Sequence, residues 1–408
     1  MSPRRVPPLD GVADDYVRLA LALQRHDPRC VDAFAGPRAW ARSARRGRPI
    51  PLPALEERAG ALLAAARACD PSDRRDFLER QIAAVAWHAR RLAGGRPGWD
   101  AELRGLFDLT PERFDRAGAR RMAGRIDVLL PGRGSVEARR RRLGMALRIA
   151  PSRLGRVLRA LLDETRRLTA ALVPLPPGEA VRLRLVRARP WAAYSWYLGD
   201  GRSRIDVNVD QVAGLVSLLE TMAHESYPGH HLYNTVRDRI LVRGRGWREH
   251  SVEVVFSPHT VLSEGVASAA RSLLLSDAGA VALLRDVLAP IAGVSRQAVE
   301  DAAVLASDGL RTHQMRVGVE AMRRRVEEGL SRREAVAFGA RYAVPRAFMT
   351  ISLRFGEAYG THMAVYPAGK DLVLRFVGSG RHRAARFRAL LETPFTPSAL
   401  ARRPAATR

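Results

Sequence analysis

The chain has 408 residues, of which 47% are hydrophobic, 27% charged and 6% aromatic, and its formal net charge is +26. This balance is typical of a folded protein with a substantial core and excludes an intrinsically disordered chain. Two cysteines are too few for a disulfide framework or a thiolate metal site.

Two further classes are excluded by the pattern of apolar residues. No window of about 18 apolar residues free of charge occurs, so we expect no membrane span. The basic N-terminus is not followed by the apolar stretch of a secretion signal. We therefore expect a cytoplasmic protein.

The positive charge has two interpretations. The basic residues are nearly all arginine, with the single lysine Lys370, and only two asparagines occur, Asn208 and Asn234. Dominance of Ala, Arg, Gly and Pro is what a GC-rich bacterial genome imposes, and the charge is then a solvated surface. The other interpretation is a face that binds nucleic acid or another polyanion. Few aromatics lie among the basic stretches and no nucleic-acid motif is recognised, which argues against that interpretation.

Residues 13–170 have a helical pattern throughout. Apolar side chains recur at three- and four-residue spacing in segments 17–23, 55–63 and 82–92. Breaks fall at Gly-Pro, Pro-Ser and Gly-Gly pairs, which commonly separate helices. We predict a helical N-terminal lobe over residues 1–173.

The pattern changes after the proline-rich segment 174–178. Segments 181–186, 191–198 and 204–209 have strand character, and Gly199-Asp200-Gly201 is a suitable hairpin turn. Helices follow from about residue 215, with a short tail over 361–376. We predict a mainly α protein in two helical lobes, with a small antiparallel β-sheet beside the helix that follows it. Residues 174–408 are expected to form the second lobe.

Segment 224–231, His-Glu-Ser-Tyr-Pro-Gly-His-His, carries the chemistry. Zinc hydrolases place two histidines four residues apart on one helical face, and the glutamate after the first takes a proton from the zinc-bound water. Here His230 and His231 follow His224 by six and seven residues. On a regular helix, six residues turn the side chain by about 120°, and seven shift it by about 10.5 Å along the axis.

Pro228 and Gly229 offer a way around this spacing. Proline removes an internal hydrogen bond and glycine lets the backbone bulge. If a bulge accommodates two residues, His230 occupies the position normally four residues after His224. We therefore prefer His230 to His231 as the second ligand.

Such a site takes a third protein ligand and leaves one position open for water. The best candidate is Glu264, in the apolar helical segment 261–268, where an unpaired carboxylate is otherwise costly. His259, Glu253 and His250 are the fallback ligands. Histidine and glutamate ligands favour zinc over calcium or magnesium.

These motifs carry a resemblance. Segment 224–231, followed by Glu264-Gly-Val-Ala, resembles the bacterial family catalogued as domain of unknown function 885, which is similar to the gluzincin metallopeptidases with two histidines and one glutamate on zinc. Segments 16–26 and 31–37 are also similar to its shorter members, so the resemblance runs over nearly the whole chain.

The resemblance implies specific roles. It implies a two-lobed helical metallopeptidase-like fold with the small sheet beside the active-site helix, and residues 174–408 as the catalytic lobe. His224, His230 and Glu264 are the expected zinc ligands, and Glu225 is the expected general base. Tyr366, in Tyr366-Pro-Ala-Gly369, is similar to a tyrosine near the family's C-terminus that can donate a hydrogen bond to an oxyanion. An ordinary packed tyrosine is the alternative.

The sequence departs from the family at three places. Val266 replaces the usual tryptophan, and Arg271 stands where a small or acidic residue is common. Thr361 and His362 occupy the stretch where an aromatic residue and an arginine usually precede the tyrosine. The metal ligands are complete, whereas the parts that face the substrate differ.

The hypothesis is a zinc-dependent hydrolase, a peptidase that cleaves an amide bond. Zinc lowers the pKa of a water molecule, Glu225 takes its proton and passes it to the leaving amine, and His362, Tyr359 or Tyr366 stabilises the oxyanion. Strand 204–209 is expected to pair with an extended peptide.

Two alternatives remain at this stage. The substrate can instead be an amide or ester of a small metabolite. The chain can also be a polyanion-binding protein with a structural metal. A structural site should have four ligands, however, and the sequence indicates three.

Overall fold

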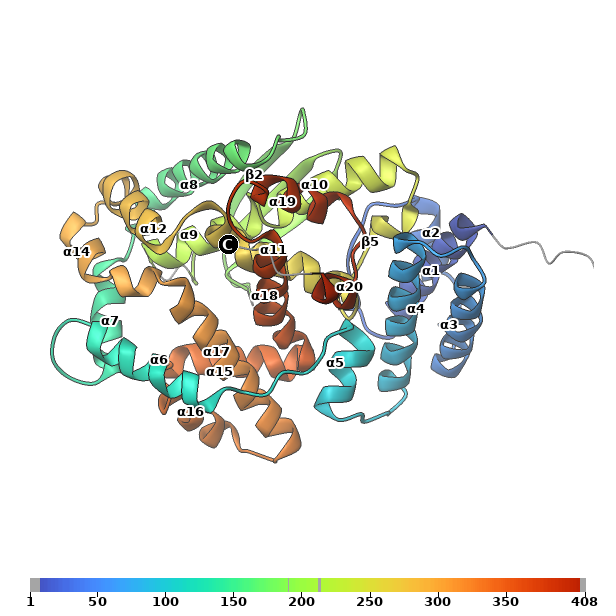
Figure 1. The fold of residues 1–408 in the computed structure, drawn as a ribbon, viewed down its shortest axis with the longest axis horizontal. Coiled ribbons are helices and arrows are strands. Elements are labelled where there is room, and N and C mark those ends of the chain that lie inside the picture. The colour runs from blue at the N-terminus through green and yellow to red at the C-terminus, as the bar shows by residue number, and fades with distance from the viewer. Residues whose placement is uncertain (1–7, 190, 212–213, 404–408) are drawn as a thin grey trace, which may run out of the picture.

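The computed structural model describes residues 8–189, 191–211 and 214–403. The molecule is mainly helical, as predicted, with small β-sheets beside the central helices (Figure 1). The N-terminal part comprises α1 (Leu9–Leu23), β1 (Val31–Phe34), α2 (Arg38–Arg45), α3 (Leu52–Arg67), α4 (Asp73–Leu92) and α5 (Trp99–Phe107).

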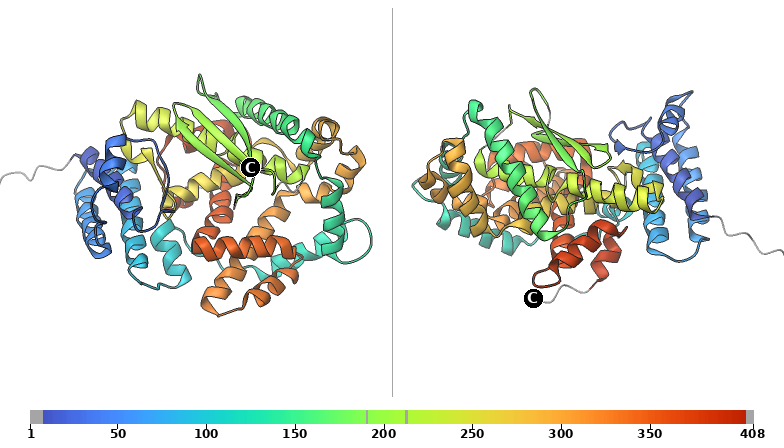
Figure 2. Two further views of the ribbon diagram at one scale, coloured as in Figure 1. Left: turned by 180° about the vertical axis from the view of Figure 1, so that it is seen from behind. Right: turned by 90° about the horizontal axis from the view of Figure 1, so that it is seen from above.

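Helices α1, α3 and α4 form one hydrophobic cluster at one end of the molecule (Figure 2). Their buried residues fall on one face of each helix, as the spacing predicted. The Ser72 side chain accepts a hydrogen bond from the backbone N–H of Arg75 and thereby caps α4, which explains why the predicted break falls there.

Three further helices lead to the main sheet: α6 (Arg116–Leu129), α7 (Val136–Ala146) and α8 (Pro151–Leu172). The sheet contains β2 (Ala180–Val186), β3 (Ala193–Gly199) and β4 (Arg202–Asn208), in the order β2-β4-β3. Strands β3 and β4 are the predicted antiparallel hairpin, and the φ angles of 82°, 56° and 69° at Gly199, Asp200 and Gly201 show why glycine flanks this turn. Strand β2 adds a parallel edge.

The central position of β4 corrects one prediction. Strand β4 is hydrogen-bonded to β2 on one side and to β3 on the other, so it has no free edge for a substrate. The expected pairing of segment 204–209 with an extended peptide is therefore wrong. Sequence order suggested an exposed strand before the active helix, but β4 inserts between the two earlier strands. Strand β3 is an edge strand of this sheet.

The candidate site is built from the next segments: α9 (Leu215–Glu225), α10 (His230–Arg237), the π-helix η1 (Asp238–Gly244), the 3₁₀ helix η2 (Arg248–Ser251), β5 (Val252–Val254) and α11 (Pro258–Leu274). Strand β5 returns to pair with β1 in a separate two-stranded antiparallel sheet. Helix α11 lies at the centre of the molecule (Figure 1), and most of its residues are buried.

The remaining chain surrounds α11. It comprises α12 (Asp277–Leu283), η3 (Leu284–Leu288), α13 (Ala289–Ala292), α14 (Arg296–Asp301), η4 (Ala303–Ala306), α15 (Asp308–Glu327), α16 (Arg332–Ala340), α17 (Arg346–Tyr359), η5 (Gly360–Ala364), α18 (Val365–Val377), α19 (Arg383–Glu392) and α20 (Pro397–Arg402).

Segment 361–376 differs from the predicted short tail. It forms η5 and α18, and α18 packs against α11 through close backbone contact. Pro367 and Gly369 hid the helix in the sequence because both residues usually interrupt helices. Pro367 lies in the first turn, where its missing N–H costs little.

The core does not divide at the predicted lobe boundary. One cluster combines residues of α8 with residues of β4, α9 and α12 to α14, and another combines α5 with α11 and α15 to α17. The division of the chain at residue 173 stays a prediction. Within the described ranges, no helix combines the length and the apolar character that a membrane crossing requires.

Candidate metal centre

The loop between α9 and α10 carries the unusual spacing of the histidines. Helix α9 ends at Glu225 and α10 begins at His230, so the helix is interrupted rather than bulged. Across the interruption the N–H of Gly229 donates to the carbonyl of Ala223 at 3.2 Å, a separation of six residues instead of four. The loop thus accommodates two additional residues, as the spacing of His224 and His230 required.

Gly229 is needed at this interruption because two backbone segments approach closely. A Cβ atom at this position would lie 1.8 Å from the carbonyl oxygen of His224 and 2.5 Å from that of Ala223. No side chain fits at such distances. Glycine is therefore required at this position for steric reasons, because the start of α10 lies directly against the end of α9.

The structure brings His224, His230 and Glu264 together. One potential ligand atom from each lies within 4.8 Å of the others. The Oε2 atom of Glu264 is 3.4 Å from Nε2 of His224 and 3.7 Å from Nε2 of His230. In a tetrahedral zinc site with bonds of about 2.0–2.1 Å, ligand atoms are about 3.3 Å apart, so these two distances are close to those of a zinc site.

The polar atoms of this group also fit a cation. Glu264 Oε2 is buried and, among the residues that the structure describes, has no hydrogen-bond partner, although two imidazoles face it. A buried carboxylate oxygen without a partner is costly. A metal ion between the three side chains would satisfy it. On the far side of one imidazole, Ser263 Oγ lies 3.3 Å from His230 Nδ1 and can orient that ring.

The charges of the group are strongly coupled. Burial raises the pKa of Glu264, but the two neighbouring histidines outweigh it and hold that pKa well below its usual range. Burial lowers the pKa of His230, but the Glu264 carboxylate outweighs it and raises that pKa to about 9. The carboxylate is therefore ionised at neutral pH, as a metal ligand must be.

His231 points away from this group. Its Nδ1 lies 2.8 Å from Ser203 Oγ on β4, and its Nε2 lies 3.0 Å from Glu179 Oε2. Tyr227 also donates a hydrogen bond to Glu179. The adjacent histidine thus anchors the loop to the sheet.

The fallback ligands also lie outside the three-residue group. The side chain of His250 is 0% exposed, and its Nδ1 is 2.7 Å from the Arg237 guanidinium. Glu253 and His259 line the same cavity as His230. Within the part of the chain that the structure describes, neither belongs to a group of metal-ligand geometry.

Glu225 is the residue after His224 and lines the same cavity of about 340 Å³. Burial raises the pKa of its carboxyl group, and the neighbouring Glu264 adds to this effect. A raised pKa makes a carboxylate a better proton acceptor near neutral pH. Its position beside one candidate ligand is that of the expected general base.

Tyr366 and His362 reach the site from the C-terminal helices. The Tyr366 hydroxyl donates to Glu264 Oε1 at 3.3 Å, and burial raises the pKa of this tyrosine well above its usual value. It therefore stays protonated. His362 is 4% exposed within a group of aromatic rings, and burial lowers its pKa to about 4, so its ring is neutral. Both residues and Tyr359 line the cavity.

Helices α11 and α18 bring Glu264 and Tyr366 side by side. The two helices cross where Gly265 meets Gly369, and a Cβ atom on Gly369 would lie 2.2 Å from the carbonyl oxygen of Val261. The glycines of the two sequence motifs thus serve one close crossing. Each glycine lies within three residues of the functional side chain that it positions.

Comparison with known proteins gives one informative structural match. The "putative lipoprotein" of Colwellia psychrerythraea aligns with 98% of this chain and 76% of its own, at a TM-score of 0.57 and 12% identity. The M32 carboxypeptidase of Deinococcus radiodurans R1 aligns over 96% and 94% with a TM-score of 0.31 and 16% identity. The first match shows a shared fold.

No family model matches the chain, and no curated protein matches it. The resemblance to the family of domain of unknown function 885 therefore depends on the motif residues alone. The first structural match supports a fold, and the chemistry has to be argued from the side chains.

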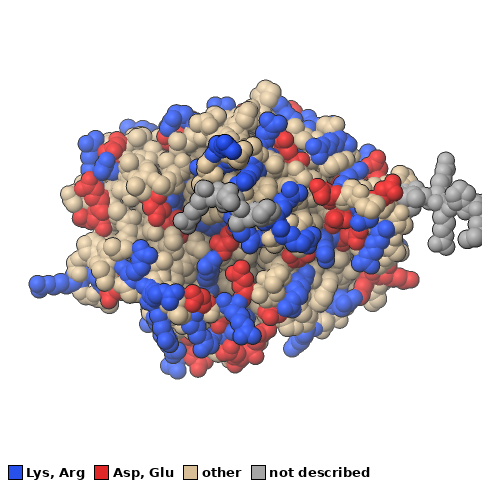
Figure 3. Space-filling view, viewed as in Figure 1, with Lys and Arg blue, Asp and Glu red and all other residues tan. Residues whose placement is uncertain are grey.

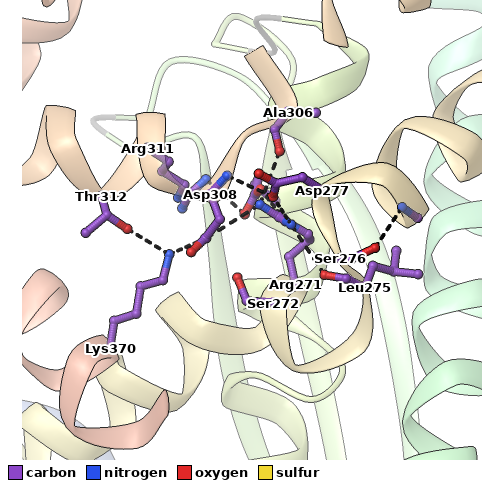
Figure 4. A network of polar contacts seen from close by, with 12 residues as sticks. Arg271, Ser272, Leu275, Ser276, Asp277, Ala306, Asp308, Arg311, Thr312 and Lys370 are labelled. Carbon is purple, nitrogen blue, oxygen red and sulfur yellow. Dashed lines mark hydrogen bonds and ion pairs between the residues drawn. The ribbon is translucent and has the colours of Figure 1, made fainter. Parts of the chain in front are cut away.

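Arg271, one of the departures from the family, has a clear structural role (Figure 4). It is 2% exposed and donates to Glu220 on α9 at 2.9 Å, to Asp277 at 2.8 Å and to the Ala306 carbonyl at 3.1 Å. Glu220 lies one turn before His224. The arginine therefore ties the helix of His224 and Glu225 to the helix of Glu264.

Lys370 extends this network. Its ammonium group donates to Asp308 and, at 3.0 Å, to Thr312, both on α15 (Figure 4). The side chain is 1% exposed, and it lies one turn after Tyr366 on α18. The chain's single lysine thus joins α18 to α15 behind the candidate site.

The surface charge is dispersed rather than gathered. On the face shown in Figure 3, arginine and lysine side chains are spread over the surface with acidic side chains between them. Many arginines form ion pairs, such as Arg323 with Glu320 at 2.8 Å. This face gives no support to a continuous polyanion-binding surface.

Several residues of the cavity were not indicated by the sequence, among them three polar ones. Asp32 on β1, Tyr194 on β3 and Asn234 on α10 line the cavity with the predicted residues. Asp32 lies in segment 31–37, whose resemblance to the family was noted, and Asn234 lies one helical turn after His230. This spacing from His230 was the signal in the sequence that could have identified Asn234. Strand β1 reaches the site only through its pairing with β5.

Proposed function

We propose that this protein is a zinc-dependent hydrolase that cleaves an amide bond, with a peptide as its substrate. The observation that carries the proposal is the meeting of His224, His230 and Glu264 at ligand distances, with Glu225 in the same cavity. The motif resemblance to the family of domain of unknown function 885 supports the same conclusion.

The donor set suits zinc, which in such sites acts as a Lewis acid and activates water. Glu225 accepts the proton of the attacking water and delivers it to the leaving nitrogen. Burial raises the pKa of Glu225, which fits a group that must take and release a proton.

Tyr366 stabilises the negative charge that develops on the carbonyl oxygen. Its hydroxyl remains protonated and lies beside Glu264, so it can donate a hydrogen bond at the reacting centre. His362 supports this role, since its neutral ring contacts Tyr366 at a centroid distance of 5.7 Å.

A peptide substrate is favoured by the edge of the sheet. Ala193, Tyr194 and Ser195 of β3 line the cavity, and β3 pairs with β4 on one side only among the described strands. An extended peptide can add to such an edge by backbone hydrogen bonds. The edge of β3 thus takes the role first expected of β4.

The size of the cavity favours a second candidate substrate, a small metabolite amide or ester. A volume of about 340 Å³ lies near the lower end of the usual range for ligand sites, about 300–1,000 Å³. The same reaction would cleave either substrate, so a turnover assay distinguishes the two candidates.

The test begins with metal content, measured by mass spectrometry on the purified protein. We expect about one zinc ion per chain, lost in His230→Ala and Glu264→Ala. His382→Ala is the matched control, because this histidine is exposed and lies outside the cavity. Absence of zinc from the wild type, also after zinc is added, would contradict the site.

The second step is turnover of a peptide mixture followed by mass spectrometry. Glu225→Gln should keep its zinc and lose turnover by a factor of about 10² or more. Full activity in this variant would overturn the assignment of the base. Activity on small amides but not on peptides would select the second candidate substrate.

A further inference from the structure

Two cavity carboxylates are not used by the proposed reaction. Asp32 on β1 and Glu253 on β5 both line the cavity. The register of these strands shifts between Val31 and Ala33, so Asp32 is the additional residue of a β-bulge opposite Glu253. Bulges redirect side chains and are common beside active sites. Here the bulge places Asp32 on the same cavity wall as Glu253.

Neither of these two carboxylates forms an ion pair with a described arginine or lysine. Asp32 accepts a hydrogen bond from the Tyr194 hydroxyl, and Glu253 has no ion pair or side-chain hydrogen bond to any described residue. Arg29 is the one arginine or lysine among the described lining residues, and its Nε donates to Asp27 at 2.9 Å. Burial and the neighbouring Asp32 raise the pKa of Glu253 to about 7, although His230 and Arg237 act in the opposite direction.

The acidic side chains of the cavity contrast with the positive net charge of the whole chain. The net charge is +26, yet the cavity holds Asp32, Glu225, Glu253 and Glu264. Glu264 belongs to the metal group and Glu225 to the reaction. The other two carboxylates therefore remain for a positive group on the substrate.

Asn234 is the second, independent indication of a ligand. It lies one turn after His230 on α10, lines the cavity and is only 9% exposed. Its side-chain amide has no hydrogen bond within the described ranges. Its amide atoms are not among the fully enclosed polar atoms, so they are open to the cavity and can pair with a ligand there. Its carbonyl oxygen adds a third acceptor beside the two carboxylates.

We infer that Asp32, Glu253 and Asn234 form a subsite for a primary ammonium group of the substrate. A primary ammonium has three N–H donors and no acceptor, which matches three acceptors in one cavity. Charge-assisted hydrogen bonds of this kind are about twice as strong as neutral ones. This inference rests on the proposed function.

The substrate class follows from the shared cavity. The subsite and the metal group line one space of about 340 Å³, so the ammonium group lies close to the bond that is cleaved. The substrate is therefore a peptide or small amide with a free amino group near the scissile bond. Removal of an amino-terminal residue is the corresponding reaction.

Binding is tested apart from turnover. The zinc-loaded Glu225→Gln protein is titrated calorimetrically with L-leucinamide and with N-acetyl-L-leucinamide, which lacks the ammonium group. We expect at least about tenfold tighter binding of L-leucinamide. Asp32→Asn and Glu253→Gln, each added to this protein, should remove most of that preference and leave the acetylated compound unaffected. Asp163→Asn, at an exposed position on α8, is the matched control.

Three outcomes would overturn the subsite. These are equal affinity for the two compounds, no measurable binding of L-leucinamide, and a second metal ion per chain that Asp32→Asn removes. The proposed function fails separately. If L-leucinamide binds selectively but no amide is cleaved by the zinc-loaded wild type, the reaction is wrong and the subsite stands. If acetylated and free peptides are cleaved at equal rates, the reaction stands and the subsite is wrong.

Discussion

Gly265 on α11 and Gly369 on α18 meet at a helix crossing without side chains between them. A Cβ atom on Gly265 would lie 2.6 Å from the carbonyl carbon of Gly369. The residues beside this crossing are Glu264, a candidate ligand, and Tyr366, which donates to it at 3.3 Å. The distance between the two functional side chains is therefore set by how closely two backbones approach.

Gly369→Ala should separate the two helices. The added methyl group meets backbone atoms that cannot move independently, so we expect a loss of about 1–3 kcal/mol in the free energy of unfolding, with reduced zinc affinity. Urea denaturation and metal analysis measure the two effects. Gly60→Ala in α3 is the matched control, because no atom lies within 4 Å of its Cβ position, and it should be neutral or stabilising by up to about 1 kcal/mol.

The two adjacent histidines should respond oppositely to substitution. His231→Ala removes the hydrogen-bond partner of Ser203 and one of the three partners of Glu179, so the metal-free protein should lose about 1–3 kcal/mol of stability and still bind zinc. His230→Ala should lose zinc with a smaller effect on the stability of the metal-free protein. If His231→Ala loses zinc and His230→Ala keeps it, His231 is the metal ligand and the assignment of His230 is wrong.

Tyr366→Phe should affect the chemical step. Removal of the hydroxyl should lower kcat by a factor of about 10–10³, with zinc content unchanged and little effect on KM. Steady-state kinetics on a cleaved peptide together with metal analysis measure this. An unchanged kcat would mean that Tyr366 only packs beside the site.

Arg271→Ala should destabilise the protein strongly. It removes the cation that pairs with Glu220, Asp277 and Asp308, and breaking a buried pair costs about 3–5 kcal/mol. Arg182→Ala, at an exposed position on β2, should change stability by less than about 0.5 kcal/mol. Similar small changes in both variants would show that α9 and α11 are held by apolar packing alone.

The loop anchor should make stability depend on acid. Burial raises the pKa of Glu179, but hydrogen bonds from His231, Tyr227 and Arg166 outweigh it and lower that pKa from 4.5 to about 2. A carboxyl group with a lowered folded-state pKa stabilises the protein above its unfolded value and loses this contribution as the pH falls toward the folded value. The wild type should therefore lose more stability between pH 5 and pH 3 than Glu179→Gln, as measured by urea denaturation. Parallel curves for the two proteins would contradict this contribution.

The sequence by itself determined the class of the fold and the members of the candidate site. Helical periodicity in segments such as 55–63 and 82–92 predicted α3 and α4, alternation predicted β2, and strand character around a Gly-Asp-Gly turn predicted β3 and β4. The motif named His224, Glu225 and Glu264, and the two additional residues of its loop favoured His230. These features are local, because periodicity, turn residues and spacing act within a few residues.

Only the tertiary structure decided how distant segments meet. The position of β4 between β2 and β3, the burial of α18 and the arrival of Asp32 at the cavity all depend on packing between segments far apart in the chain. Gly265 and Gly369 read as helix-weakening residues in the sequence, since each lacks a side chain. At the crossing that same lack permits the close approach, because backbones separated by 104 positions in the chain contact each other only after folding.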